Sequence, residues 1–82
     1  MYVYILENQT KKHYIGMTKD LEKRLSSHNR GSNRSTKNGR PWHLVYFEEC
    51  ATKVAALKRE KQIKAYKGGQ AFKNLLILDN FD

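Results

Sequence analysis

Five side chains spread along this 82-residue chain are of types that can act together on a phosphodiester. They are Tyr4, Tyr14, Arg24, His28 and Glu60. A carboxylate can hold a hard divalent ion such as Mg²⁺ or Mn²⁺, whose remaining coordination goes to waters and a phosphate oxygen. An arginine can neutralise charge that grows on the phosphorus oxygens. A tyrosine close to both cations could have its pKa lowered enough to act as a general base.

Two of the five stand where packing alone would call for apolar residues. Leu21, Arg24, Leu25 and His28 follow the spacing i, i+3, i+4, i+7, which places them on one face of a helix. An arginine and a histidine that share a face with two leucines are a local conflict, and such conflicts are expected at functional sites. The pattern therefore predicts that this helix face carries part of a site.

Glu60 presents a similar conflict in a later helix. At about 100° per residue it points close to Ala56 and Ile63, so we expect it on or beside an apolar face. A carboxylate there is costly unless it is paired or binds a cation. An ordinary i, i+4 ion pair with Lys64 is the alternative, and spacing alone favours it somewhat.

The elements that must position these residues begin with a predicted hairpin. β-branched and aromatic residues predict a strand over 2–6, and a polar, turn-like stretch over 7–12 separates it from a second short strand over 13–17. Period 2 divides the first strand into two faces, with Tyr2, Tyr4 and Leu6 on one and Val3 and Ile5 on the other. Tyr4 and Tyr14 could then lie side by side.

A helix and a long loop follow this hairpin. At Gly16 we expect a tight break, after which Thr18 or Asp20 caps a helix that ends near His28. The stretch 29–43 contains glycines, a proline, serines and asparagines, and we expect a long loop there. A loop of this length in a small domain is usually functional or disordered.

Three further elements complete the predicted order, ββαβα with a terminal helix, in a single domain over residues 1–82. They are a strand over 44–50, a helix from the cap Thr52 to about Tyr66 with a stop at Lys67-Gly68-Gly69, and a short helix over 70–78. Residues 75–78 could also form a strand. An 82-residue chain predicts one domain with a small core.

Two short motifs resemble the paired signature of the GIY-YIG nuclease superfamily. Tyr2-Val3-Tyr4 keeps the tyrosine of the first motif but has Tyr for Gly and Val for Ile, and Tyr14-Ile15-Gly16 matches the second motif in full. Arg24 matches the family arginine, and His28 stands where members have His or Tyr. Glu60, within Arg59-Glu60-Lys61-Gln62-Ile63-Lys64, matches the metal-binding glutamate. The chain looks most like the small stand-alone bacterial members, which share a catalytic core with branch nucleases and the incision subunit of excision repair.

The resemblance implies an α/β (α+β) fold, ββαβαα, with a central three-stranded antiparallel sheet flanked by helices. It also implies a divalent ion, Mg²⁺ or Mn²⁺, on Glu60 and hydrolysis of DNA phosphodiester bonds by an activated water, with a structure-specific role in DNA repair or recombination as one outcome. Tyr14 would be the general base or its hydrogen-bond partner, and Tyr4 would position the water or the phosphate. Arg24 would stabilise the transition state, and His28 would contact the phosphate or relay a proton. Which tyrosine takes the proton is left open.

The charge of the chain favours a nucleic-acid partner. Lys and Arg number 16 against 8 Asp and Glu, a net charge of +8. All the basic residues lie between Lys11 and Lys73, where only five acidic residues accompany them, so this span has a net charge of +11. Such a charge favours a polyanion.

The loop over 29–43 is a candidate clamp on the DNA backbone. It holds four basic residues and no acid: Arg30, Arg34, Lys37 and Arg40. A plain flexible connector is the alternative. Trp42 could stack on a base or anchor the core at the start of the third strand.

Two further function classes remain open from the sequence. One is a nucleic-acid-binding module that keeps the fold and charge but cleaves little or nothing. The other is a basic RNA-associated structural protein, which only the charge supports. A protein partner could supply substrate targeting, and the sequence does not indicate an oligomeric state.

Several classes of protein and site are not expected. No apolar run approaches the roughly 18 to 20 residues that cross a membrane, and we identify no signal peptide. The single cysteine, Cys50, allows no intramolecular disulfide and fits a cytoplasmic location. His13 and His43 lack partners at ligand spacing, so we predict no zinc site and place both at the surface or a strand edge.

Overall fold

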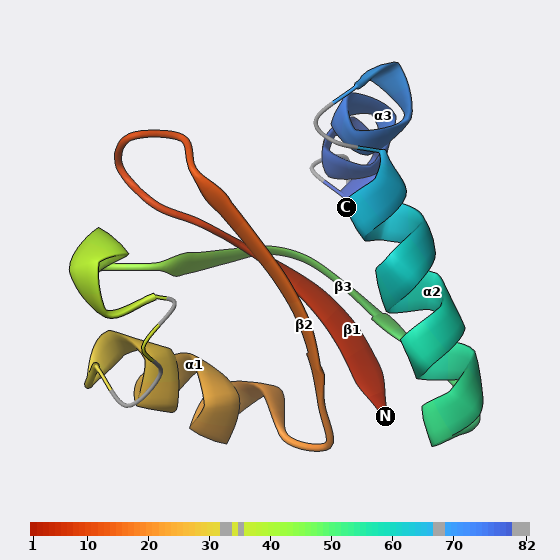
Figure 1. The fold of residues 1–82 in the computed structure, drawn as a ribbon, viewed down its shortest axis with the longest axis horizontal. Helices are drawn as coiled ribbons and strands as arrows, with labels where there is room; N and C mark the ends of the chain where they lie inside the picture. Colours follow the sequence, from red (N-terminus) through yellow and green to blue (C-terminus); the bar gives the residue numbers. More distant parts are fainter. Residues whose placement is uncertain (32–33, 35, 67–68, 80–82) are drawn as a thin grey trace.

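The computed structural model describes residues 1–31, 34, 36–66 and 69–79. Its elements are β1 (Tyr2–Glu7), β2 (His13–Thr18), α1 (Leu21–Asn29), the 3-10 turn η1 (Lys37–Gly39), β3 (His43–Glu49), α2 (Lys53–Ala65) and α3 (Gln70–Asp79), as Figure 1 shows. The predicted order ββαβαα is therefore confirmed, with η1 as an addition inside the expected loop. Residues 75–78 belong to α3, so the helix interpretation of that segment holds rather than the strand.

The three strands form one antiparallel sheet in the order β2-β1-β3. Tyr4 of β1 lies opposite Gly16 of β2, and Leu6 lies opposite Tyr14. On the other side of β1 the register shifts between Ile5 and Leu6. Because β1 is central and β2 is an edge strand, the Tyr4 ring is flanked by neighbours while Tyr14 stands at an open edge.

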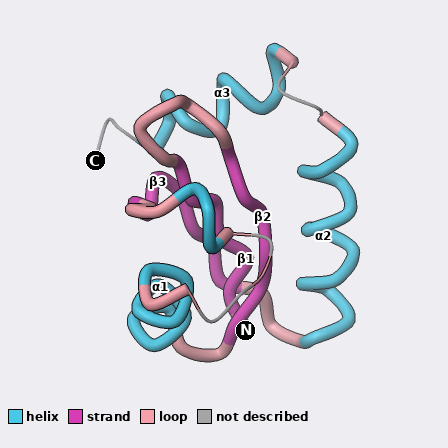
Figure 2. The backbone as a smooth tube through the Cα atoms, turned by 60° about the vertical axis from the view of Figure 1, so that its left-hand side comes forward, coloured by secondary structure: helices cyan, strands magenta, loops and turns pink. Residues whose placement is uncertain are grey.

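The helices cover opposite faces of this sheet, with α1 on one side and α2 on the other (Figures 1 and 2). Val3 and Ile5 pack against α2 and α3 through Ala56, Ile63 and Phe72. On the other face the buried cluster is built from side chains of β1, of α1 and of the segment before β3: Tyr4, Leu6, Trp42, Leu21 and Leu25. The predicted period 2 of β1 is confirmed, and it places Tyr4 between the sheet and α1.

The expected break at Gly16 is wrong. Gly16 lies inside β2, in register with Tyr4, and the strand continues to Thr18. The chain turns after the strand instead, where the Thr18 hydroxyl oxygen accepts a hydrogen bond from the backbone N–H of Asp20 at 3.1 Å. Of the two candidate caps, Asp20 begins the helix, because its Oδ1 accepts from the backbone N–H of Lys23.

The loop after α1 is more ordered over its described residues than the sequence suggests. The Asn29 side chain bridges to the backbone of Trp42, accepting from its N–H at 2.7 Å and donating to its carbonyl at 3.1 Å. Trp42 is 5% exposed, so it is a core anchor and is not available to stack on a base. Residues 32, 33 and 35 of the expected loop, and Lys67 and Gly68 of the expected stop signal, lie outside the described residues.

The long helix begins as predicted. Thr52 caps it, since its hydroxyl accepts from the backbone N–H of Ala55, and Tyr66 ends it. Arg59 in the middle of α2 donates a hydrogen bond to the Glu48 carboxylate of β3. That carboxylate raises the pKa of Arg59 above its usual value, which shows a strong ion pair. The pair fixes α2 against the sheet and so fixes the direction of its neighbour Glu60.

Candidate active site

The centre of the candidate site is the Tyr4 hydroxyl, which lies between β1 and α1. Arg24, one turn before His28 on α1, donates from Nε to the Tyr4 oxygen at 3.2 Å. The same oxygen lies 2.8 Å from His28 Nε2. Tyr4 is 2% exposed and His28 is fully buried. The sequence conflict on the helix face is therefore resolved by one buried tyrosine that satisfies both polar side chains.

Burial decides where the protons lie in this cluster. It raises the pKa of Tyr4 despite the opposing effect of Arg24, so the phenol is neutral and must donate its own proton. Burial and then the charge of Arg24 lower the pKa of His28 to about 4, so the imidazole is neutral near pH 7. Tyr4 accepts from Arg24 and donates to His28 Nε2, which leaves the imidazole proton on Nδ1.

The Nδ1 proton of His28 has a hydrogen-bond partner that the sequence did not reveal. Thr36 Oγ1 lies 2.7 Å from His28 Nδ1, and Thr36 is fully buried. The Thr36 carbonyl in turn accepts from Trp42 Nε1 at 2.7 Å. A hydroxyl in an irregular segment gives no periodic signal, so only the tertiary structure shows that it orients the histidine.

Tyr14 completes the aromatic part of the site from β2. Its ring meets His28 edge to face with centroids 4.7 Å apart, and the centroids of Tyr14 and Tyr4 are 6.3 Å apart. The pKa of Arg24 is raised, first by its hydrogen bond to Tyr4 and further by one to Tyr14. The structure thus brings both tyrosines, Arg24 and His28 into one cluster, and Tyr14 is the more exposed tyrosine.

A glycine is needed at position 16 for a reason other than the expected turn. A Cβ added there would lie 2.7 Å from the Tyr4 hydroxyl and 3.0 Å from Cε1 of Tyr14. Only a glycine lets the two rings close over the strand at this point. Gly16 is therefore needed because it has no side chain, and not because of its backbone flexibility.

Glu60 belongs to α2, which packs on β2 and β1 from the opposite face of the sheet. Its charge contributes to the raised pKa of Tyr4, so the carboxylate is within electrostatic reach of the phenol across the β2 edge. It also forms the i, i+4 ion pair with Lys64, at 2.7 Å. The Glu60 side chain is 18% exposed, as expected of a group beside an apolar face.

The donor set around Glu60 fits a hard divalent ion better than a transition metal. Among residues 1–31, 34, 36–66 and 69–79, no three or more His, Cys, Asp or Glu side chains gather as a metal-binding group. Mg²⁺ is commonly held by one or two carboxylates, with waters and substrate phosphates filling the remaining positions. Lys64 is 54% exposed and can move aside from the Glu60 oxygens. One carboxylate at an accessible edge is compatible with such an ion.

The four loop cations lie on the α1 side of the sheet. Arg30 is the C-cap of α1, and Arg40 donates from Nε to the Lys37 carbonyl at 2.8 Å. All four are exposed: Arg30, Arg34, Lys37 and Arg40. Within the described part of the chain none of them pairs with a carboxylate. They form a positive rim near the segment that carries Thr36.

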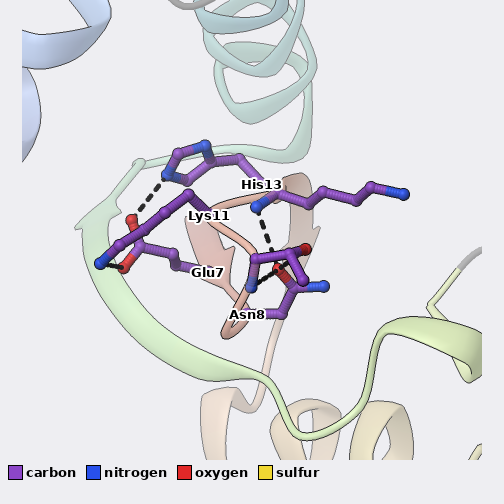
Figure 3. Close-up of polar contacts among 6 residues, drawn as sticks. Glu7, Asn8, Lys11 and His13 are labelled. Atoms are coloured by element: carbon purple, nitrogen blue, oxygen red, sulfur yellow. Dashed lines mark hydrogen bonds and ion pairs between the residues drawn. The ribbon is translucent and has the colours of Figure 1, made fainter.

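The two remaining histidines stand at strand ends. His13 begins β2 and His43 begins β3, and both are exposed, as predicted. Figure 3 shows His13 and Lys11 converging on the Glu7 carboxylate, at 3.0 and 3.6 Å. These contacts belong to the hairpin tip and lie apart from the Tyr4 cluster.

Comparisons with known proteins agree with this geometry. The family model described as the GIY-YIG catalytic domain matches residues 1–71. The UPF0213 protein of Staphylococcus aureus strain Mu3 is 47% identical over 66 residues, which is 79% of this chain and 80% of the relative, and its counterparts in strains Mu50 and COL match equally. No solved structure matches the chain. Of the helices that the structure describes, none has the length and apolar character needed to span a membrane.

Proposed function

The chain belongs to the GIY-YIG family of nuclease catalytic domains, and on that premise we propose that it is a divalent-metal-dependent endonuclease that hydrolyses DNA phosphodiester bonds. The observation that carries the proposal is the Tyr4 cluster. One buried phenol joins Arg24 to His28, with Tyr14 beside it and Glu60 within electrostatic reach. A domain that only binds nucleic acid has no use for a carboxylate close to its phosphate site.

Arg24 would receive the scissile phosphate. Its Nε is occupied by Tyr4, which fixes the guanidinium plane while the side chain stays partly exposed. A guanidinium held in this way can stabilise the negative charge that grows on the non-bridging oxygens. Tyr4 is therefore a positioning residue for Arg24.

Tyr14 would take the proton of the attacking water. It is half-buried at the open edge of the sheet, whereas Tyr4 is enclosed and keeps its own proton. As the water oxygen bonds to phosphorus, its proton would pass to the phenolate oxygen of Tyr14, which thereby becomes a phenol. The bond from phosphorus to the sugar oxygen breaks, and that oxygen leaves and is protonated by solvent.

His28 would act on the site only through its hydrogen bond with Tyr4. Because the imidazole has no exposed surface, it cannot touch a phosphate in this structure. Its neutral Nε2 accepts from the Tyr4 hydroxyl, so the role that we propose for His28 is to position that hydroxyl. It holds the phenol oxygen in the position from which that oxygen orients Arg24.

Glu60 would hold the divalent ion, with Lys64 displaced from its oxygens. When bound, Mg²⁺ or Mn²⁺ would draw electron density from a phosphate oxygen and stabilise the developing charge. The loop cations would contact the DNA backbone on either side of the cleaved bond. The proposal extends to a structure-specific role in DNA repair or recombination, in which a protein partner would supply the substrate targeting.

The Glu60–Lys64 ion pair favours the alternative, a DNA-binding module of the same fold that cleaves little. If the pair is permanent, the carboxylate is not free for a metal. A Lys64→Ala variant separates the two functions, because an endonuclease is expected to keep or gain metal-dependent cleavage when Glu60 is released. A binding module would stay inactive and only lose affinity.

A cleavage assay tests the proposal directly. Labelled duplex, branched and single-stranded DNA are incubated with the wild-type protein in Mg²⁺, in Mn²⁺ and in EDTA, beside Arg24→Ala and Glu60→Ala. We expect metal-dependent nicks with the wild-type protein and a loss of at least about 100-fold in either variant. Cleavage that survives either substitution would contradict the site, and salt-sensitive binding without cleavage would support the binding module.

A further inference from the structure

A cavity of about 530 Å³ lies between the hairpin tip and η1, next to the Tyr4 cluster. Its lining comes from two segments far apart in the sequence: Asn8, Gln9, Thr10, Lys12, His13 and Tyr14 from the hairpin, and Asn38, Gly39, Arg40 and Trp42 from η1 to the start of β3. The volume falls within the range of pockets that take a small ligand. Tyr14 lines this cavity and also packs against His28, so the two sites share a wall.

The walls of the cavity are built and held together by specific contacts. Asn8 is 6% exposed, and its Oδ1 accepts from the backbone N–H of Thr10, the hydroxyl of Thr10 and the backbone N–H of Lys12. Its Nδ2 lies close to Gly39, where an added Cβ would be 2.8 Å from it and would collide with the Trp42 indole. Gly39 therefore lets the two segments meet and leaves the cavity open above them.

The charge of the lining favours an anionic ligand. Lys12 and Arg40 are both exposed and line the cavity, and none of the lining residues that the structure describes is a carboxylate. The one carboxylate on the same hairpin, Glu7, forms ion pairs with Lys11 and His13, as Figure 3 shows. Glu7 does not line the cavity. The exposed amides Gln9 and Asn38 supply donors and acceptors of the kind that contact the edge of a base.

From this lining and its wall shared with Tyr14, we propose that the cavity binds the nucleotide adjacent to the cleaved phosphodiester, and binds it unpaired. The inference rests on the proposed nuclease function and names its substrate class: DNA with an unpaired nucleotide at the cleavage position. A base in a continuous duplex stays stacked and presents only its groove edges, so it cannot enter a recess walled on two sides. An unstacked base can enter, with its phosphates on Lys12 and Arg40 and its edge on Gln9 and Asn38.

Equilibrium binding in EDTA tests this without any cleavage. Fluorescence anisotropy compares a labelled duplex with the same duplex carrying one unpaired nucleotide, for the wild-type protein and for the double variant Gln9→Ala with Asn38→Ala. Neither residue belongs to the catalytic cluster, and the net charge is unchanged. We expect the wild-type protein to prefer the unpaired substrate by about tenfold, and the double variant to lose that preference while its duplex affinity stays within about twofold.

The matched control removes two amides outside the cavity, Gln62→Ala with Gln70→Ala, and is expected to keep the preference. Each single variant, Gln9→Ala and Asn38→Ala, is measured with its circular dichroism spectrum, so that a folding defect in the double variant cannot decide the result. Equal wild-type affinity for both DNAs would overturn the inference. So would an equal loss for both DNAs in the double variant. Either result alongside intact metal-dependent cleavage would leave the nuclease proposal standing, so the two failures can be told apart.

Discussion

At the scale of single residues, burial sets the protonation of the site. Tyr4, His28 and Thr36 have almost no exposed surface. Hydrogen bonds run from Arg24 Nε to the Tyr4 hydroxyl, from there to His28 Nε2, and from His28 Nδ1 to the Thr36 hydroxyl. Among the described residues, no buried side-chain nitrogen or oxygen lacks a partner. Such a network is stable only while the imidazole is neutral, because a second proton on His28 would oppose both the Tyr4 hydroxyl proton and the Arg24 charge.

The first prediction concerns acid. The pKa of His28 is about 4 in the folded protein and about 6.5 in the unfolded chain. Between these values the unfolded state binds more protons, so the folded state loses stability as pH falls. The His28 contribution is complete above about pH 6.5 and is lost near pH 4, a change of up to about 3 kcal/mol in the free energy of unfolding.

Denaturant unfolding at several pH values checks this, with His28→Gln as the comparison because glutamine can still accept from Tyr4 but does not titrate. The wild-type protein should lose more stability between pH 7 and 4 than the variant does. NMR titration of the imidazole gives an independent value in the wild-type protein. A midpoint near 6.5 there would refute the buried neutral histidine.

The second prediction concerns Thr36. Thr36→Val keeps the shape but leaves the His28 Nδ1 proton without its acceptor, at a cost of about 1–3 kcal/mol. The imidazole proton should then redistribute toward Nε2, which nitrogen NMR detects, and kcat should fall with little change in KM. Thr36→Ser keeps the hydroxyl and should restore both the tautomer and the rate. Equal losses in the two variants would show that Thr36 only fills space.

At the scale of elements, the proposed site needs residues from opposite faces of the sheet. Tyr4 faces α1, while Glu60 comes from α2 on the other face. Only an edge strand allows side chains from both faces to approach one phosphate, and β2 is that strand. Gly16 in its middle removes the side chain that would otherwise separate Tyr4 from Tyr14.

The third prediction therefore concerns Gly16→Ala. In an extended strand this change would ordinarily stabilise a protein, because alanine restricts the unfolded chain. Here the new methyl group would lie 2.7 Å from the Tyr4 hydroxyl, so we expect a loss of about 1–3 kcal/mol and a displaced ring. Thermal unfolding shows the sign. A gain in stability with activity intact would contradict the close packing of the two tyrosines.

The sequence predicted most of the elements because their signals are local. Alternation along β1 and the caps Asp20 and Thr52 lie within a few residues of what they determine. Gly16 was misinterpreted because a glycine that turns the chain and one that accommodates a ring across a strand look alike in sequence. Thr36 was missed, and Trp42 stayed open, because their partners lie across the fold.

The site itself was predicted less evenly. Four of its residues are shown to cluster. Helical periodicity paired Arg24 with His28 and the predicted hairpin paired Tyr4 with Tyr14, and the family resemblance then joined the two pairs. Glu60 is largely buried, as its spacing beside the apolar residues predicts, and it also forms the ion pair with Lys64 that was the alternative.

At the scale of the whole molecule, the positive charge should decide how tightly DNA is held. The exposed cations Arg30, Arg34, Lys37 and Arg40 lie on the same side of the sheet as Tyr4. Each phosphate contact releases about 0.9 counterions from duplex DNA, so binding through these residues must weaken steeply with salt.

The fourth prediction is that Arg30→Ala with Arg34→Ala weakens DNA binding and lowers the slope of log affinity against log salt by about two. The control removes the same charge elsewhere, through Lys53→Ala with Lys73→Ala on the helices of the opposite face. Anisotropy titrations over a range of salt concentrations measure both. An equal change of affinity and salt slope in the test and control variants would mean that the total charge of the protein sets DNA binding, and not the loop cations.

The central claim is that Glu60 and the Tyr4 cluster form one metal-dependent active site. The most direct test compares single-turnover cleavage rates of the wild-type protein, Glu60→Gln and Glu49→Gln, a control that neutralises an exposed carboxylate on β3, during a titration with Mg²⁺. We predict that Glu49→Gln follows the wild-type curve and that Glu60→Gln loses at least about 100-fold at every metal concentration. A Glu60→Gln rate within a few-fold of the wild-type rate would contradict the account.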